Sequence, residues 1–258
     1  PLIKEALDHV DRFSMIQEAD ATRIQRLGAS KDRIEVNGNA KYDLLLTQAS
    51  VSLKEEIEAQ LCLRRNQPVF LAGSTRGAED RIILEVYQKI RQSIPEALLI
   101  IAPRHISKTP DIEKSVREKG FEYQLRTQIG EPGVNRTAPV LIINTIGELQ
   151  ALYSVASLVF CGGSLEPLGG QNVLEAAVWG KPVLYGPSMT DFLDAKSLLE
   201  KTGGGIQIKD GADLAEKAIY YLSNPPEAER VGRLAKKAVL SNTGAADKHA
   251  AVIWELLR

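Results

Sequence analysis

Short runs of apolar residues alternate along the chain with longer segments that have helical periodicity. The apolar runs predict strands at residues 13–16, 34–36, 69–72, 98–102, 141–143, 158–161, 183–185 and 205–208. Helical patterns separate most of these runs, so strands and helices follow one another in turn. This order predicts an α/β fold with a doubly wound, Rossmann-like parallel sheet and helices on both faces. Such sheets bind ligands at the carboxyl ends of their strands.

The pattern changes at residues 37–48, where a strand leads into the polar helical segment 52–60. We predict an interdomain joint there, with residues 1–48 as the tail of an earlier domain and residues 49–258 as a complete Rossmann-like domain. The chain begins with Pro1, inside an element, and this predicts that it is the later part of a longer protein.

Glycines and prolines mark the main breaks in the second half of the chain. Residues 126–139 contain two of each and predict a loop. From residue 212 onward, helical patterns continue to residue 258, with breaks at residues 224–226 and 242–244. We therefore predict three helices at the C-terminal end.

Composition and charge exclude several classes of protein. The 258 residues are 44% apolar and carry a formal charge of −1, so no overall field favours nucleic acid. The two cysteines, Cys62 and Cys161, lie in apolar segments, which favours buried thiols in a reducing compartment over a disulfide. No apolar run reaches eighteen residues and no signal peptide is present, so we predict a soluble cytoplasmic chain.

The most informative stretch is GGSLEPLGGQNVLEAAVWGKPVLYGP, at residues 162–187. Its glycines allow a tight turn after the strand at residues 158–161, and the pattern then predicts a helix starting near Asn172. The N–H groups and positive dipole end of that helix would favour an anion by about 0.3–1 kcal/mol. Glu175, one turn inside the helix and among apolar neighbours, could accept hydrogen bonds from a ribose diol. The stretch therefore predicts a site for the phosphate and ribose of a nucleotide.

Three further strand ends carry polar residues, and each has two interpretations. Residues 73–77 (GSTRG) could bind an anion, or Ser74 or Thr75 could cap a helix. Arg104 could grip a phosphate bidentately or be a solvated surface residue. In the segment 145–148, Glu148 could merely complement a helix dipole, or the exposed backbone of the turn could read a base edge.

Motifs of other nucleotide-dependent enzymes are absent from the sequence. Residues 73–77 are too short for a Walker loop and lack its lysine, and no G-x-G-x-x-G or G-x-S-x-G motif occurs. The histidines, at positions 9, 105 and 249, have no partners at metal-ligand spacing, and no Asp-x-Asp pair is present. The residues thus predict a metal-independent nucleotide-binding domain without a catalytic base of its own.

Taken together, these segments resemble the later part of a 3-deoxy-D-manno-octulosonic acid (Kdo) transferase, a glycosyltransferase of the GT-B type. Six motifs occur in the order of that family: GNAKYD at 38–43, AGST at 72–75, APRH at 102–105, TIGEL at 145–149, GGSLEPLGGQNVLEAA at 162–177 and GKPVLYGP at 180–187. The chain departs from the family at Gln171 and Val173, where His and Pro are common, and at Arg76, where His is common.

The resemblance implies transfer of Kdo from CMP-Kdo to a lipid A precursor, a step of lipopolysaccharide biosynthesis at the cytoplasmic side of the bacterial inner membrane. The implied CMP contacts are Pro103, Arg104, Ile146, Gly147, Glu148, Asn172, Val173, Leu174 and Glu175. Arg104 would hold the phosphate, Glu175 the ribose hydroxyls, and the turn at residues 146–148 would face the cytosine or adjacent groups.

Family members also carry a membrane-anchoring segment and a first domain that binds the acceptor and supplies a glutamate base. The resemblance therefore implies that this chain has no catalytic residue, requires no metal or cofactor, and binds the donor without catalysing transfer alone. Acceptor and membrane contacts would be made by the missing part, and no nucleic acid partner is implied.

Two other functions are compatible with the same residues. The glycine loop and the helix glutamate recur across the GT-B architecture, so the donor could be a UDP- or GDP-sugar. Because fold alone does not determine function, the chain could also be a non-enzymatic module that senses a nucleotide or acts as a scaffold.

Overall fold

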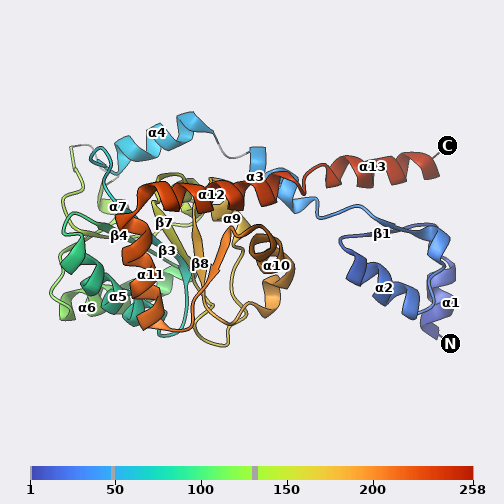
Figure 1. Cartoon of the computed structure of the whole chain (residues 1–258), viewed down its shortest axis with the longest axis horizontal. Helices are drawn as coiled ribbons and strands as arrows, with labels where there is room; N and C mark the ends of the chain where they lie inside the picture. The colour runs from blue at the N-terminus through green and yellow to red at the C-terminus, as the bar shows by residue number, and fades with distance from the viewer. Residues whose placement is uncertain (1, 48–49, 130–132, 258) are drawn as a thin grey trace. The chain divides into compact units, whose positions relative to one another are not determined.

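The computed structural model describes residues 2–47, 50–129 and 133–257 (Figure 1). These residues form two compact units. One contains the described residues up to Thr47 together with those from Val239 onward, and the other runs from Ser50 to Ala238. The C-terminal helix thus groups with the N-terminal segment. The functional division into an acceptor-domain tail and a donor domain stays a prediction.

The larger unit is built on a parallel sheet, which within the described residues has seven strands in the order β5-β6-β4-β3-β7-β8-β9. Their bounds are β3 Val69–Thr75, β4 Leu98–Pro103, β5 Tyr123–Leu125, β6 Val140–Ile142, β7 Leu158–Cys161, β8 Val183–Tyr185 and β9 Gly205–Gln207. From β3 the chain first adds strands on one side and then, from β7, on the other. The strand order therefore reverses between β3 and β7, and the predicted doubly wound α/β fold is confirmed.

Helices cover both faces of this sheet (Figure 1). Their bounds are α4 Val51–Gln60, α5 Glu79–Ser93, α6 Thr109–Glu118, α7 Arg126–Ile129, α8 Leu149–Leu152, α9 Leu174–Ala177, α10 Leu193–Thr202, α11 Gly211–Ser223 and α12 Pro225–Leu240. A short 3-10 helix, η3, spans Tyr153–Val155. On one face, α5, α6 and α11 share a core with the strands.

The periodicity of α5 explains how it packs on the sheet. Ile83, Leu84, Tyr87 and Ile90 recur at three- and four-residue spacing and are fully buried, whereas Arg81 on the opposite side is exposed. Strand residues of β3 and β4 are buried on both faces, which is why these strands read as continuous apolar runs. The hydroxyl of Tyr87 donates to the carbonyl oxygens of Ala97 and Pro139, at 2.7 and 2.8 Å, so this core tyrosine keeps its hydrogen bonds.

Three local expectations differ from the structure. The strand β5 escapes prediction because its residues are all half-buried and include the polar Gln124, so no apolar run marks it. Residues 126–139, predicted as a loop, contain the short helix α7, and residues 130–132 lie outside the described part. The helix after the glycine loop begins at Leu174 and not near Asn172, so Glu175 lies in its first turn.

The smaller unit contains α1 Leu2–Asp8, β1 Phe13–Met15, α2 Glu18–Arg26, β2 Ile34–Val36, α3 Lys41–Thr47 and α13 Ala245–Leu256. The strands β1 and β2 pair in parallel. The Asp43 carboxylate accepts hydrogen bonds from the backbone N–H groups of Gly244 and Ala246, at 2.6 and 2.7 Å, at the start of α13. His249 of α13 contacts the Ser14 hydroxyl at 2.6 Å. These contacts fasten the last helix to the N-terminal segment.

The three predicted C-terminal helices are confirmed as α11, α12 and α13. Cys62 and Cys161 are both free thiols, but only Cys161 is buried as predicted, and Cys62 is half-buried. Within the described ranges, no helix has the length and apolar character needed to cross a membrane.

Candidate functional site

A cavity of about 230 Å³ opens at the carboxyl edge of the sheet in the larger unit. Its lining comes from the end of β3, the residue after β4, the turn before α8, the helices α8 and η3, and the segment that leads into α9. The lining residues are Ser74, Arg104, Gly147, Leu149, Gln150, Tyr153, Gln171, Asn172 and Glu175. It lies at the edge where ligands bind in doubly wound sheets.

Four of the sequence-predicted contacts line this cavity, namely Arg104, Gly147, Asn172 and Glu175. They come from three segments that are far apart in sequence and each follow a strand, because parallel strands bring their carboxyl ends to one edge. An exposed guanidinium and a partly buried carboxylate therefore border the same small cavity.

The other predicted contacts do not line it. The side chains of Val173 and Leu174 are fully buried in the core, so only their backbone groups could reach a ligand. Ile146 is 83% exposed and Pro103 is the half-buried last residue of β4. The Glu148 carboxylate is engaged elsewhere: Arg126 lies 3.0 Å from it, and the Thr145 hydroxyl donates to it.

Burial controls the electrostatics of Glu175. Loss of solvent raises the pKa of its carboxyl above the usual value of 4.5, and a hydrogen bond from Asn172 and the charge of Arg104 partly oppose this shift. The Asn172 amide nitrogen lies 3.3 Å from Oε1 of Glu175. The carboxylate thus has one weak donor and room for further donors, such as the hydroxyls of a bound ligand.

Asn172 also contacts the start of α9. Its side-chain oxygen accepts a hydrogen bond from the N–H of Leu174, at 3.1 Å, and the cap position of the helix is Val173. α9 has four residues, which sum to a much smaller dipole than the longer helix that the sequence pattern predicts. Positive charge at the cavity therefore comes mainly from Arg104.

The glycine loop, residues 162–170, follows β7. A buried glutamate that the sequence pattern does not indicate binds its backbone. The Glu79 side chain, 0% exposed, accepts hydrogen bonds from the N–H groups of Gly163, Ser164 and Leu165, at 2.6, 2.9 and 2.9 Å. It also accepts the N–H of Arg76 at 2.9 Å. The protein's own carboxylate therefore occupies these N–H groups, so they are not available to a phosphate.

Close backbone approach explains the first glycine of that loop. A Cβ at Gly162 would lie 2.5 Å from the carbonyl oxygen of Ser74, at the end of β3. The N–H of Gly162 donates to the carbonyl of Gly73 at 2.8 Å. Gly162 thus lets the loop pass directly against the strand end that lines the cavity.

The hydroxyl residues at the end of β3, Ser74 and Thr75, do not cap α5. Its cap position is Ala78, without a side-chain hydrogen bond, and the Thr75 hydroxyl donates instead to Asp80, at 2.5 Å. Ser74 lines the cavity with a φ of 55°, in the left-handed region that a non-glycine residue rarely adopts. Arg76 donates to the carbonyl of Leu168 at 3.1 Å, so its guanidinium holds the glycine loop.

Gln150 and Tyr153 are lining residues that the sequence pattern does not indicate. The Gln150 side-chain nitrogen is buried without a hydrogen-bond partner among the described residues. Burial also raises the pKa of the Tyr153 hydroxyl well above its usual value. An unsatisfied buried donor in a cavity wall favours a ligand with an acceptor at that point.

Among the residues that the structure describes, no three His, Cys, Asp or Glu side chains converge as a metal site would require.

Comparison with solved structures identifies the fold. The C-terminal CMP-Kdo binding domain of WaaA from Acinetobacter baumannii aligns with a TM-score of 0.66 and 23% identity, over 76% of this chain and 98% of that one. The architecture is that of the C-terminal domain of a GT-B glycosyltransferase.

Sequence relatives identify the family. The chain is 31% identical to the bifunctional glycosyltransferase/methyltransferase of Fusobacterium nucleatum over 88% of its residues, and 29% identical to the 3-deoxy-D-manno-octulosonic acid transferase of Haemophilus influenzae over 86%. Residues 1–44 match the sequence model of the family described as 3-deoxy-D-manno-octulosonic-acid transferase (kdotransferase). The chain belongs to the Kdo transferase family. It spans 35% and 52% of the lengths of these two relatives.

Proposed function

We propose that this chain is the donor-binding half of a Kdo transferase and that CMP-Kdo binds in the cavity between Arg104 and Glu175. The observation that carries the proposal is the meeting of these two side chains at the switch-point edge of the sheet. Family membership supports the choice of donor, since relatives in that family are named for Kdo transfer.

Each group in the cavity has a role that its chemistry fits. Arg104 supplies a permanent charge and paired donors for the phosphate. Glu175 accepts hydrogen bonds from the ribose hydroxyls, which offset its desolvation. The Gln150 amide and the backbone of residues 146–148 face the cytosine, and the unpaired Gln150 nitrogen donates to an acceptor of the base.

In the transfer step, an acceptor hydroxyl oxygen forms a bond to the anomeric carbon of Kdo as the bond from that carbon to the CMP phosphate oxygen breaks. The hydroxyl proton goes to a base on an acceptor domain outside this chain, and the leaving phosphate carries the electron pair away. Arg104 stabilises the growing phosphate charge, which removes the need for a metal ion. The acceptor is a lipid A precursor at the cytoplasmic side of the bacterial inner membrane.

Calorimetric titration with CMP tests the proposal. We expect saturable binding to the wild-type chain and at least a tenfold loss in R104A and in E175A, because each change removes charge-assisted hydrogen bonds worth about 1.5–3 kcal/mol. The matched controls R81A and E216A change exposed residues outside the cavity and should bind CMP as the wild type does.

Competition between CMP, UDP and GDP for the chain distinguishes a Kdo transferase from a GT-B enzyme that uses another nucleotide sugar. Preference for CMP supports the Kdo transferase, whereas a clear preference for UDP or GDP assigns another nucleotide sugar. Binding of CMP that neither R104A nor E175A weakens would contradict the site.

A further inference from the structure

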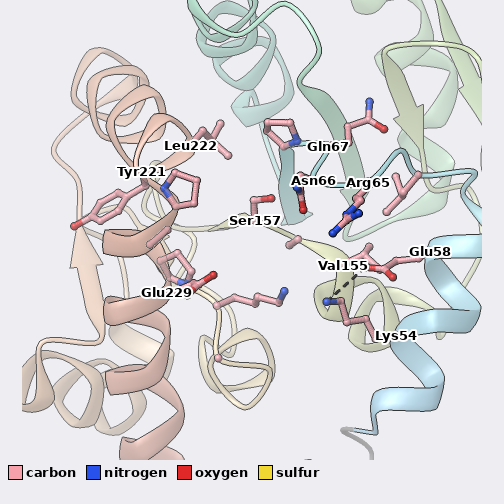
Figure 2. A pocket seen from close by; sticks show the side chains of 18 of the residues that line it. Lys54, Glu58, Arg65, Asn66, Gln67, Val155, Ser157, Tyr221, Leu222 and Glu229 are labelled. Atoms are coloured by element: carbon pink, nitrogen blue, oxygen red, sulfur yellow. Dashed lines mark ion pairs between the residues drawn. The ribbon is translucent and has the colours of Figure 1, made fainter.

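A second and larger cavity, of about 740 Å³, lies at the opposite edge of the sheet in the same unit (Figure 2). Pro68, Ser157 and Pro182 line it, and they immediately precede β3, β7 and β8. No lining residue is shared with the cavity that contains Arg104. Its volume falls in the range typical of small-molecule sites, about 300–1,000 Å³.

The charges around this cavity are unbalanced. Its charged lining residues are Lys54, Arg64, Arg65, Lys181, Glu58 and Glu229. Glu58 pairs with Lys54 at 3.5 Å, and Glu229 pairs with Arg233 of its own helix at 3.6 Å. Among the described residues, no side chain forms an ion pair or hydrogen bond with the charged groups of Arg64, Arg65 or Lys181. The cavity therefore keeps positive charge that the protein does not neutralise.

Lys181 is the most constrained of these cations. It lies between Gly180 and Pro182 in the turn before β8 and is partly buried. Burial lowers the pKa of its ammonium to about 8; the charge of Lys54 lowers it further and that of Glu58 acts in the opposite direction. A partly desolvated ammonium without a hydrogen-bond acceptor is costly, and a bound anion would offset that cost.

The walls suit a ligand that combines an anionic group with an organic part. Arg65 and Lys54 point into the cavity from one side, and Glu229 of α12 lies on the other (Figure 2). Pro225 and Ala228 place the first turn of the sixteen-residue helix α12, with its positive dipole end, at the wall. Leu63, Val155 and Leu222 add apolar surface.

We propose that this cavity binds a phosphorylated small molecule through Lys181 and Arg65, at a site separate from the donor cavity. The competing explanation is that the cations only complement the C-terminal ends of α4 and α11, at Gln60 and Ser223, around a water-filled groove. The two explanations differ in whether an anion binds with measurable affinity.

Calorimetric titration of the full 258-residue chain with sodium pyrophosphate tests the proposal. We expect saturable binding that K181M and R65Q each weaken about tenfold, since each removes a charged hydrogen-bond donor. K237M, which changes an exposed lysine of α12 outside both cavities, should bind pyrophosphate as the wild type does. Because Arg65 is exposed, R65Q keeps the test valid even if K181M lowers stability.

Two results would overturn the proposal. One is the absence of saturable pyrophosphate binding to the wild-type chain. The other is binding that K181M and R65Q leave unchanged, and loss in R104A alone would then assign pyrophosphate to the donor cavity. Neither result bears on CMP binding, so this inference and the proposed function fail separately.

Discussion

At the scale of single residues, the burial and hydrogen bonding of Glu175 lead to a testable pH dependence of the proposed donor site. Its carboxyl is partly buried, with one hydrogen bond from Asn172 and the charge of Arg104 nearby. Burial raises its pKa above 4.5, so the carboxylate protonates at higher pH than an ordinary glutamate. Binding that depends on the ionised form must therefore weaken as the pH falls through this raised pKa.

The pH dependence of CMP affinity gives a prediction for Glu175. At neutral pH the wild type should bind more tightly than E175Q, because the ionised carboxylate accepts stronger hydrogen bonds than the amide. As the pH falls toward 4.5, the affinity ratio should shrink, since a protonated carboxyl resembles the amide. Taking the ratio cancels the titration of CMP itself. A ratio that stays constant between neutral pH and pH 4.5 would exclude the ribose role of Glu175.

Gln171 is the other residue of interest at this scale. It lines the donor cavity, at the position where the family commonly has a histidine. An amide there can donate and accept hydrogen bonds but cannot become cationic. In the proposed site, Arg104 is therefore the residue that supplies positive charge to the phosphate.

At the scale of elements, the contact between α5 and the glycine loop organises the carboxyl edge of the sheet. Glu79 in the first turn of α5 accepts the N–H groups of residues 163–165, and Arg76 just before α5 holds the carbonyl of Leu168. The loop is thus fastened at two points to the segment after β3. This keeps the following residues, Gln171 to Glu175, in place beside Arg104.

Replacement of Glu79 by glutamine tests this element contact. The amide presents its own donors to backbone N–H groups in a fully buried site, so we expect the free energy of unfolding to fall by about 1.5–3 kcal/mol. CMP affinity should fall as well, although Glu79 does not line the cavity. Urea unfolding and calorimetry measure both quantities. E216Q, on the exposed side of α11, is the isosteric control, and an E79Q chain as stable as this control would contradict the contact's importance.

The elements also show what sequence can predict. The strands β3, β4, β7 and β8 are predictable because both faces of a parallel sheet are buried, which requires uninterrupted apolar residues. The edge strand β5 is half-buried and has no such run. At the start of α9, the Leu174 N–H donates to the Asn172 side chain, a local contact that the helical periodicity does not reveal.

The candidate site could also be predicted only in part from the sequence. Arg104, Gly147, Asn172 and Glu175 could be predicted because each follows a strand, and strand ends converge in this topology. Gln150 and Tyr153 reach the cavity from α8 and η3, whose placement depends on packing. Glu79 meets Gly163 across 84 positions in the sequence, a pairing that no local pattern encodes.

At the scale of the whole molecule, two of the cavities in the larger unit differ in position and in chemistry. The cavity at the carboxyl edge, near the reversal of strand order, is lined by both a cation, Arg104, and a carboxylate, Glu175, which suit a nucleotide. The cavity at the amino edge has unpaired cations that suit a phosphate-bearing ligand. The proposed donor site and the proposed second site therefore lie at opposite edges of the sheet.

The most direct test of the central claim is a crystal structure of this chain with CMP. The account predicts CMP at the carboxyl edge, with its phosphate within hydrogen-bond distance of the Arg104 guanidinium and its ribose hydroxyls on the Glu175 carboxylate. CMP bound at the amino edge beside Lys181, or bound at the carboxyl edge without contact to either Arg104 or Glu175, would contradict it.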